Sequence, residues 1–376
     1  MKLLINTSTL KGTGVSQVAV SFIQECRQIG GNEYIVFMSP NIANNLHVET
    51  FPSNFSFYVF GKESLYGLKG KKDIRKMKRL EKELSPDAVF SVFGPSLWRP
   101  KAPHLMGFAY GHYVYDDLEY SRDVHLNDSW GRKLRRFVHM RQLKNNGDYY
   151  VCETEDVANR LSKKYNISPK NIYTVSNTVG TAFIEYKGSF KNPGAVFKFY
   201  TLASAAPNKN FSILNEVIPI LRERHPSGKI KFYVTIPEES YNQIFDESVK
   251  EDVINVGPLK VEECPDFVDS CDALFLPTLL ECFSASYPEA MLLGKPILTS
   301  DLPFATSVCG DSASYFDPLN PSEIAERIFS LVENPHLYQD LQNKGLEQIK
   351  VFPSPHERAE EYIKILKTIA KKNVEE

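Results

Sequence analysis

Two glutamates of this chain, Glu281 and Glu289, stand eight positions apart in the segment PTLLECFSASYPEAMLLGKPILTSD at residues 277–301. Glu281 lies in a loop just after an apolar run, 272–277, that predicts a buried strand. Glu289 lies near the start of a short helix that Gly294 and Pro296 should end. Backbone amides at a helix start bind anions, and carboxylates accept hydrogen bonds from hydroxyls. The segment therefore predicts a site for a ligand with a diphosphate and several hydroxyls, such as a nucleotide-sugar.

Both glutamates also have a structural explanation. Ser286 and Glu289 fit a capping box, with Ser286 as the N-cap and Glu289 at the third helical position. Glu281 could be a solvated loop residue, although no neighbour in the sequence requires a carboxylate there. We favour a binding role for Glu281 and leave both roles open for Glu289.

Further candidates follow other predicted strands, because ligands of parallel sheets bind at the carboxyl ends of the strands. Lys209, in LASAAPNKN at 202–210, could neutralise a diphosphate. Gly12 and Gly14 open the first helix and let the backbone approach a phosphate or sugar. His112 follows a possible strand end. Gln17 replaces the third glycine of a dinucleotide fingerprint, and no acidic residue ends the second strand, so we reject NAD binding.

Each of these candidates has a plainer interpretation. Lys209 could be a solvated loop lysine, Gly12 and Gly14 a simple strand–helix turn, and His112 a structural or surface histidine. No Asp-X-Asp motif follows a strand, and Asp116-Asp117 stands in a tyrosine-rich loop. We therefore expect no catalytic metal.

The totals describe an ordinary globular protein of two domains. The chain has 376 residues, of which 42% are hydrophobic and 24% charged. Residues 1–180 hold 25 lysines and arginines against 17 aspartates and glutamates, an excess of 8, whereas residues 181–376 hold 19 against 29, a deficit of 10. No stretch approaches a membrane span, and the first residues turn polar too soon for a signal peptide. The six cysteines show no CxxC pair, which predicts free thiols in a reducing cytosol.

Short apolar runs alternate with helical patterns along the chain. This order predicts an α/β protein with parallel sheets. The expected strands are 3–6, 34–38, 88–93, 149–152 and 172–175 in the first half, and 197–202, 230–235, 253–256, 273–276 and 296–299 in the second. Helices are expected at 15–29, 212–224, 337–349 and 355–372. A polar stretch at 180–193 is the expected linker, which places one domain at 1–182 and the other at 183–355, with a last helix at 356–376 that could pack back on the first.

A basic stretch, Lys69–Lys82, lies in a predicted amphipathic helix with apolar residues at Ile74, Met77, Leu80 and Leu84. A solvated helix on the first domain explains it, and contact with an anionic membrane surface or a lipid diphosphate is the alternative. Residues 132–136, near Trp130 and Phe137, could add to the same face. No recognition motif for nucleic acid accompanies the charge.

Taken together, these motifs resemble the family 4 retaining glycosyltransferases (glycosyl transferase group 1), which have the two-domain GT-B fold. The family's Glu-X7-Glu motif matches Glu281 and Glu289, with Glu281-Cys-Phe-Ser where the family commonly has Glu-Gly-Phe-Gly. The other matches are Pro288-Glu-Ala-Met, Gly294-Lys-Pro-Ile, Thr299-Ser-Asp, Gly310-Asp-Ser-Ala-Ser-Tyr-Phe-Asp-Pro, the Gly12 and Gly14 loop, and Asn177 before the second domain. The resemblance implies two Rossmann-like domains that face each other across a cleft.

The resemblance also implies roles for the candidates. Glu289 would bind the ribose of the donor, Glu281 the hydroxyls of the transferred sugar, and Lys209 the leaving diphosphate. The site would also include His112, near the donor sugar, and the donor-binding residues Phe283, Ser284, Ala285, Ser204, Gly12 and Gly14. The donor would be a nucleotide-diphospho-sugar, UDP- or GDP-linked, and no cofactor or metal would be needed. The acceptor would be a glycan or a lipid-linked hydroxyl in cell-surface polysaccharide or lipopolysaccharide biosynthesis, at the inner face of a membrane.

The chain departs from the family pattern at two places. The family usually has an arginine five residues before the lysine, and Ala203-Ser204-Ala205 stands there instead. Cys282 and Ser284 replace two glycines. A non-catalytic binding protein of the same fold is therefore the alternative function. A two-domain solute-binding protein is disfavoured by the cysteines and the expected absence of a signal peptide.

Overall fold

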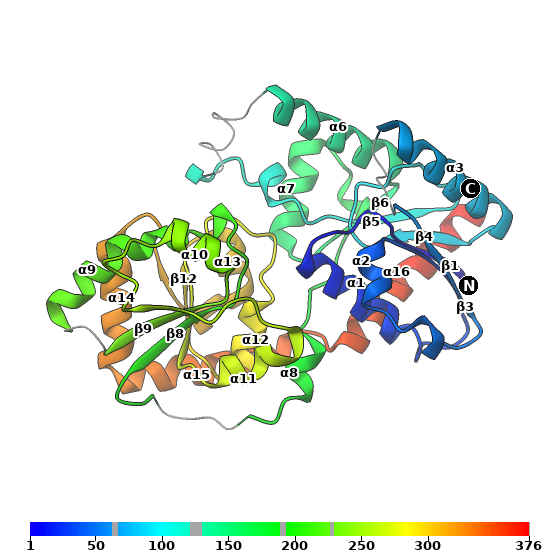
Figure 1. The fold of residues 1–376 in the computed structure, drawn as a ribbon. Coiled ribbons are helices and arrows are strands. Elements are labelled where there is room, and N and C mark those ends of the chain that lie inside the picture. The colour runs from blue at the N-terminus through cyan, green and yellow to red at the C-terminus, as the bar shows by residue number, and fades with distance from the viewer. Residues whose placement is uncertain (62–66, 121–129, 189–192, 226–228, 376) are drawn as a thin grey trace. The chain divides into compact units, whose positions relative to one another are not determined.

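The computed structural model describes residues 1–61, 67–120, 130–188, 193–225 and 229–375. The chain divides into two compact units (Figure 1). Unit 1 comprises residues 1–177 and 353–376, and unit 2 comprises residues 178–352. The boundaries expected from the sequence lie after residues 182 and 355.

Unit 1 is built on a parallel sheet in the order β3-β2-β1-β4-β5-β6-β7. Its strands are β1 (Lys2–Thr7), β2 (Glu33–Met38), β3 (Phe55–Val59), β4 (Ala88–Ser91), β5 (His104–Gly107), β6 (Tyr149–Cys152) and β7 (Ile172–Thr174). The central strands are nearly continuous apolar runs because helices cover both faces of the sheet. The prediction missed β3, an edge strand with several partly or fully exposed residues, and stated β5 only as a possible strand end.

The helices of unit 1 form two layers (Figure 1). They are α1 (Thr13–Glu25), α2 (Pro40–Asn44), α3 (Gly67–Leu84), α4 (Gly111–Val114), α6 (Trp130–Asn146), α7 (Glu155–Tyr165) and α16 (Pro355–Glu375). One large core joins α1 and α16 to the sheet, and a smaller one joins α3 to the sheet. The last helix therefore belongs to unit 1 although unit 2 separates it from the rest in sequence.

A buried arginine fixes α16 in unit 1. Arg358 is 2% exposed and donates hydrogen bonds to Asn177 Oδ1 and, at 3.0 Å, to Ser21 Oγ on α1. The ring of Tyr362 packs edge-on against Phe22 at 5.4 Å between centroids. These contacts tie the two ends of unit 1 together, at the residues where the chain leaves it and returns.

Unit 2 repeats the plan with a parallel sheet in the order β10-β9-β8-β11-β12-β13. Its strands are β8 (Phe197–Thr201), β9 (Ile230–Val234), β10 (Val253–Asn255), β11 (Ala273–Leu276), β12 (Ile297–Ser300) and β13 (Ala313–Phe316). Its helices are α8 (Thr181–Glu185), α9 (Leu214–Arg224), α10 (Glu238–Ile244), α11 (Cys264–Asp269), α12 (Ser286–Leu292), α13 (Pro303–Cys309), α14 (Pro321–Glu333) and α15 (Pro335–Gln348). The α/β prediction with two parallel sheets is confirmed. Residues 181–185 of the expected linker instead form α8, which packs against α11 and α12, and residues 189–192 lie outside the described residues.

In each sheet the chain starts in the middle, builds one side, and then crosses to build the other. The reversal falls between β1 and β4 in unit 1 and between β8 and β11 in unit 2. Loops that follow the two strands at such a point diverge and leave a crevice at the carboxyl edge of the sheet. These two crevices are therefore where ligand-binding residues are expected.

Candidate functional site

Lys209 and Glu281 meet at the reversal point of the unit 2 sheet. Lys209 ends a short 3₁₀ helix, η3 (Pro207–Lys209), in the loop after β8, and Glu281 lies in the loop after β11. Their side chains form an ion pair between Lys209 Nζ and Glu281 Oε1. The two residues are 72 positions apart, so the sheet topology alone brings them together.

Hydrogen bonds to Asn208 also hold the Glu281 loop onto η3. The carbonyl of Asn208 accepts bonds from Leu279 N at 2.7 Å and from Thr278 Oγ1 at 2.9 Å. Its side-chain Nδ2 donates to Leu280 O at 2.8 Å. Thr278 Oγ1 also lies 3.0 Å from Glu281 Oε1. The Glu281 carboxylate is therefore positioned both by the bonds between the two loops and by Thr278 of its own loop.

The environment of this pair contradicts the plainer interpretations of both residues. The side chain of Lys209 is 15% exposed and that of Glu281 is 13% exposed, so neither is a solvated loop residue. An ion pair with so little exposure is stabilised only if hydrogen bonds satisfy its remaining atoms. Thr278 supplies one such bond to Glu281.

Glu289 lies on α12, which begins directly after this loop. The predicted capping box is wrong: Ala285 is the N-cap, no side chain caps the helix, and Ser286 Oγ donates to Leu202 O at 3.3 Å. Ser286 is drawn to the loop after β8 because it is buried there and needs a partner. The predicted end of the helix is confirmed, with α12 ending at Leu292 and Gly294 in the left-handed region at φ +60°.

The Glu289 carboxyl group is enclosed although the residue as a whole is only partly buried. Desolvation raises its pKa to about 8, and a backbone hydrogen bond from Gly180 counteracts part of that rise. A carboxyl group is held in this poorly solvated state where a ligand hydroxyl or cation completes its environment. Glu289 thus has no capping role in α12 and stays available for a ligand.

Tyr200, on β8, is a further residue of this region that the sequence analysis missed. It is 1% exposed, and its hydroxyl is one of the buried polar atoms in the described ranges that lack a hydrogen-bond partner. Burial raises its pKa, and the charge of Glu289 raises it further. The position of Tyr200 in an apolar strand did not indicate a place in the site, because a tyrosine there usually packs as a core residue.

The loop between Glu281 and Glu289 carries three predicted donor-binding residues. Phe283 and Ala285 are partly exposed, whereas Ser284 is buried. The Phe283 ring packs edge-on against Phe352 at 6.1 Å. Within the described residues, neither Cys282 nor Ser284 has a positive φ, so this loop forms without the two glycines that the family usually has.

The remaining candidates are distributed between the units. Ser204 is exposed in the loop after β8 in unit 2. Gly12 is the N-cap of α1 and Gly14 its second residue, both exposed in unit 1 after β1, and a Cβ at Gly14 would meet open space. His112 is exposed on α4, after β5 in unit 1. The ion pair of Lys209 with Glu281 joins two of the candidates.

Asp116 and Asp117 have structural partners in unit 1. Asp117 Oδ1 pairs with Arg160 at 2.6 Å, and Asp116 Oδ2 pairs with Lys164 at 2.8 Å. Arg160 and Lys164 both lie on α7. In the part of the chain that the structure describes, no group of three or more His, Cys, Asp or Glu side chains could hold a metal ion. Across those same residues, no helix is long and apolar enough to cross a membrane.

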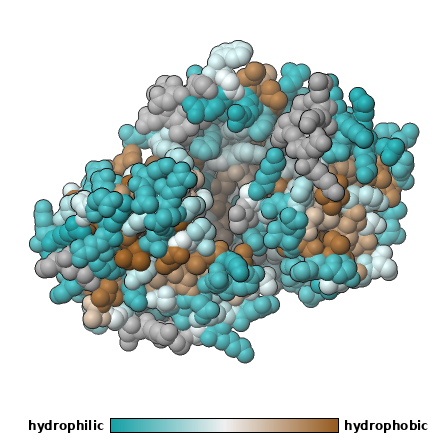
Figure 2. Space-filling model, viewed as in Figure 1, coloured by the Kyte–Doolittle hydropathy of each residue, from teal (hydrophilic) through white to brown (hydrophobic). Residues whose placement is uncertain are grey.

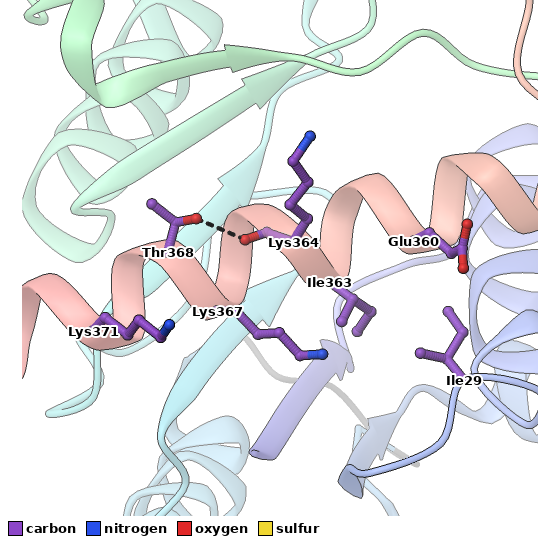
Figure 3. A pocket seen from close by; sticks show the side chains of 7 residues that line it. All are labelled: Ile29, Glu360, Ile363, Lys364, Lys367, Thr368 and Lys371. Atoms are coloured by element: carbon purple, nitrogen blue, oxygen red, sulfur yellow. Dashed lines mark hydrogen bonds between the residues drawn. The ribbon is translucent and has the colours of Figure 1, made fainter.

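A separate cavity of about 340 Å³ lies in unit 1 along α16 (Figure 3). It is lined by Ile29, Glu360, Ile363, Lys364, Lys367, Thr368 and Lys371. The lysines are exposed, and none of the lining residues is one that the sequence predicts for ligand binding. We therefore do not assign it to the candidate site.

Residues 183–348 match the model of the family described as glycosyl transferases group 1. No curated protein sequence matches the chain. Among solved structures, the fold is similar to a glycosyltransferase from Rickettsia africae ESF-5, with 14% identity, a TM-score of 0.74 and 98% of both chains covered. It is also similar to HepE of Anabaena in complex with UDP and glucose, with 12% identity, a TM-score of 0.70, and 98% of this chain and 100% of that chain covered.

A third similar structure is WaaG, described as a glycosyltransferase involved in lipopolysaccharide biosynthesis. Its identity is 12% and its TM-score 0.69, with 97% of this chain and 99% of that chain covered. At these identities the structures show the fold, which is the predicted GT-B type with two Rossmann-like units. The matched range 183–348 contains Lys209, Glu281 and Glu289.

Proposed function

We propose that this chain, whose residues 183–348 form a domain of the glycosyl transferases group 1, transfers a sugar from a nucleotide-diphospho-sugar to an acceptor hydroxyl. The observation that carries the proposal is the pairing of Lys209 with Glu281 at the reversal point of the unit 2 sheet. The cation of Lys209 suits the anionic phosphates of a sugar diphosphate, and the carboxylate of Glu281 suits the neutral hydroxyls of its sugar.

Each residue then has a distinct task. Glu289 accepts hydrogen bonds from the ribose hydroxyls, and Glu281 accepts them from the hydroxyls of the transferred sugar. Lys209 stabilises the negative charge that grows on the leaving diphosphate, together with the backbone amides of Ser284 and Ala285 at the start of α12. His112 of unit 1 would contact the donor sugar. None of these tasks requires a metal ion.

The proposed chemistry retains the configuration of the sugar, which we infer from the resemblance to family 4. The bond between the sugar's anomeric carbon and the diphosphate oxygen breaks, and both of its electrons stay on that oxygen. The acceptor hydroxyl forms the new bond on the same face of the sugar ring. The diphosphate oxygen takes the acceptor's proton, so the products are the glycoside and the nucleoside diphosphate.

We propose a UDP- or GDP-linked donor, and the UDP and glucose bound to the similar HepE structure favour UDP. The acceptor class that we propose is a glycan or a lipid-linked hydroxyl. WaaG, a similar structure, is described as acting in lipopolysaccharide biosynthesis, which supports a cell-surface product.

Thermal stabilisation by UDP-, GDP-, ADP-, TDP- and CMP-linked compounds tests the site. We expect a higher Tm with one diphosphate class and no such increase in Glu289→Ala. Donor hydrolysis or transfer, measured as released nucleoside diphosphate, then tests the activity. If Glu281→Ala kept the wild-type turnover, the assignment of this site would be wrong.

A non-catalytic nucleotide-sugar or glycan-binding protein is the second candidate. It is favoured by the exposed Ser204 in the region where the family has an arginine, because a single lysine leaves the diphosphate with less positive charge. Binding without any donor hydrolysis, across donors of the class that stabilises the protein, would support this candidate over the transferase.

A further inference from the structure

The first three turns of α6 carry four exposed apolar side chains on one face. Trp130 is 78% exposed, Leu134 46%, Phe137 63% and Val138 41%. Their spacing of four, seven and eight residues places them along one side of a helix. The other large apolar side chains of comparable exposure, within the described ranges, stand singly on separate segments: Val48, Val59, Ile184, Val256, Leu319 and Val351.

The other end of α6 is anchored in unit 1. Met140 and Leu143 are buried, and Asn146 Nδ2 donates to Ser96 O at 2.7 Å. Arg99 reaches the carbonyl of Asn145 at 3.1 Å. The exposed apolar face is therefore continuous with helical turns that are anchored in unit 1.

The charges that α6 itself carries have one sign. The charged residues of α6 are all basic: Arg132, Lys133, Arg135, Arg136, Arg141 and Lys144. The connections through α3 and α6 run in the same direction along the strand order of the sheet. Because crossovers between parallel strands are right-handed, these two helices lie on the same face of the sheet. The described part of α3 adds exposed cations, among them Lys71, Lys72, Arg75, Lys78 and Lys82.

The apolar side of α3 is not available for contact with a membrane. Met77 is fully buried, and Ile74, Leu80 and Leu84 pack with it against the sheet. The expected membrane contact at Lys69–Lys82 can therefore supply charge but no inserting side chain. In unit 1 the inserting side chains are on α6, where Figure 2 shows hydrophobic surface at the top of the view and Figure 1 places that helix.

We propose that the exposed face of α6 docks on a membrane that contains anionic lipids. Trp130 and Phe137 enter the interface between headgroups and acyl chains, while the surrounding lysines and arginines contact the anionic headgroups. This occupant fits because an apolar layer beneath a negative surface complements an apolar stripe on a helix whose charged residues are all basic. The docking is independent of the chemistry proposed for unit 2.

The two tryptophans of the chain allow a direct fluorescence test of the docking. Trp98 is 2% exposed and Trp130 is 78% exposed, so Trp130 reports on contact with the membrane. We expect a blue shift of tryptophan emission with vesicles of phosphatidylcholine containing about one third phosphatidylglycerol, and none with phosphatidylcholine alone. The shift should disappear in Trp130→Phe, while co-sedimentation of that variant with the vesicles persists.

Substitutions distinguish the contribution of the inserted apolar side chains from that of the basic side chains. Phe137→Ser should lower the vesicle partition coefficient about tenfold, since one large apolar side chain is lost. Lys133→Gln combined with Arg135→Gln should lower it by about tenfold or more at low salt, and by much less at about 0.5 M salt. Val351→Ser, which changes an equally exposed residue in unit 2, is the matched control and should bind as wild type.

Absence of binding to anionic vesicles at low salt would overturn the proposal, as would binding that Phe137→Ser leaves unchanged. Sedimentation velocity without lipid distinguishes the other occupants. If the wild type were a dimer that Phe137→Ser converts into a monomer, the face would be an interface between two copies and not a membrane contact.

Discussion

Lys209 and Glu281 neutralise each other in the structure, although the proposed function gives them separate ligands. Their ion pair is largely shielded from solvent, with side-chain exposures of 15% and 13%. A nucleoside diphosphate must therefore share Lys209 with Glu281 or separate the pair before it gains the full charge of the lysine. The pair would make nucleotide binding depend on Glu281, for which we propose a contact with the sugar.

Replacing Glu281 should have different effects on nucleotide binding and on sugar transfer. Glu281→Gln frees Lys209, so the nucleoside diphosphate alone should bind as tightly as to wild type or several-fold tighter, by about 1 kcal/mol. Transfer should fall by about a hundredfold or more, because the sugar loses a charged acceptor. Isothermal titration and a product assay measure the two effects.

Lys209→Ala is the counterpart and should weaken both binding and transfer. Glu239→Gln, which changes an exposed carboxylate on α10, controls for net charge. Weaker nucleotide binding in Glu281→Gln than in wild type would show that the ion pair assists the diphosphate rather than competing with it.

The pKa of Glu289 predicts two pH effects. Desolvation raises this pKa from 4.5 to about 8. Between those values the folded protein holds a proton that the unfolded chain releases, so this group's contribution to stability falls as pH rises from 4.5 to about 8. The Tm of Glu289→Gln, which resembles the protonated form, should depend less on pH than that of wild type.

Nucleotide affinity should change in the opposite direction. Ribose hydroxyls donate to the ionised carboxylate, so affinity should rise between about pH 6 and about pH 9. This rise should be absent in Glu289→Gln. Equal pH slopes in the two proteins would contradict the assignment of ribose binding to Glu289.

Asn208 should control the position of Glu281 without affecting the fold. Asn208→Ala removes the hydrogen bond to Leu280 O, worth about 1 kcal/mol, from the loop contact. We expect a loss of transfer of about fivefold to tenfold, with a Tm within a few degrees of wild type. Asn343→Ala, on the exposed side of α15, is the control, and an equal loss of activity there would argue against a positioning role.

Ser204 gives a gain-of-function test of the missing arginine. The side chain is exposed in the loop after β8, so arginine can be accommodated there without repacking. Ser204→Arg should tighten nucleoside diphosphate binding about fivefold and make it more sensitive to salt. Ser204→Gln is the neutral control. Unchanged affinity and salt dependence would place the second phosphate contact elsewhere.

Arg358 should be essential for the stability of unit 1. Arg358→Ala leaves a cavity and removes the bonds to Asn177 and Ser21, at a cost of about 3–5 kcal/mol. Urea unfolding followed through the buried Trp98 measures this loss. Arg99→Ala, whose side chain is 62% exposed, should cost about 1 kcal/mol or less, and equal losses would deny Arg358 this role.

The sequence predicted the structure well wherever a single hydrophobic pattern dominated a segment. Continuous apolar runs predicted the central strands such as β1, β2 and β11 because both faces of those strands are buried. The same reasoning missed β13 and β3, two edge strands in which buried residues are mixed with residues that are partly or fully exposed. The helix around Glu289 was predicted, including its end at Gly294, but its N-cap was not, because Ser286 found a partner from another loop.

By itself, the sequence determined the two-sheet plan, the end of α12 and the residue types of the site, because these follow from local periodicity and from backbone preferences. The tertiary structure decided which of these residues meet. The strand order places the loop after β8 beside the loop after β11, which joins Lys209 to Glu281 across 72 positions. It also decided which amphipathic helix hides its apolar face, since α3 packs on the sheet while the start of α6 does not. Pairing and burial of this kind depend on contacts between distant segments, which no local pattern encodes.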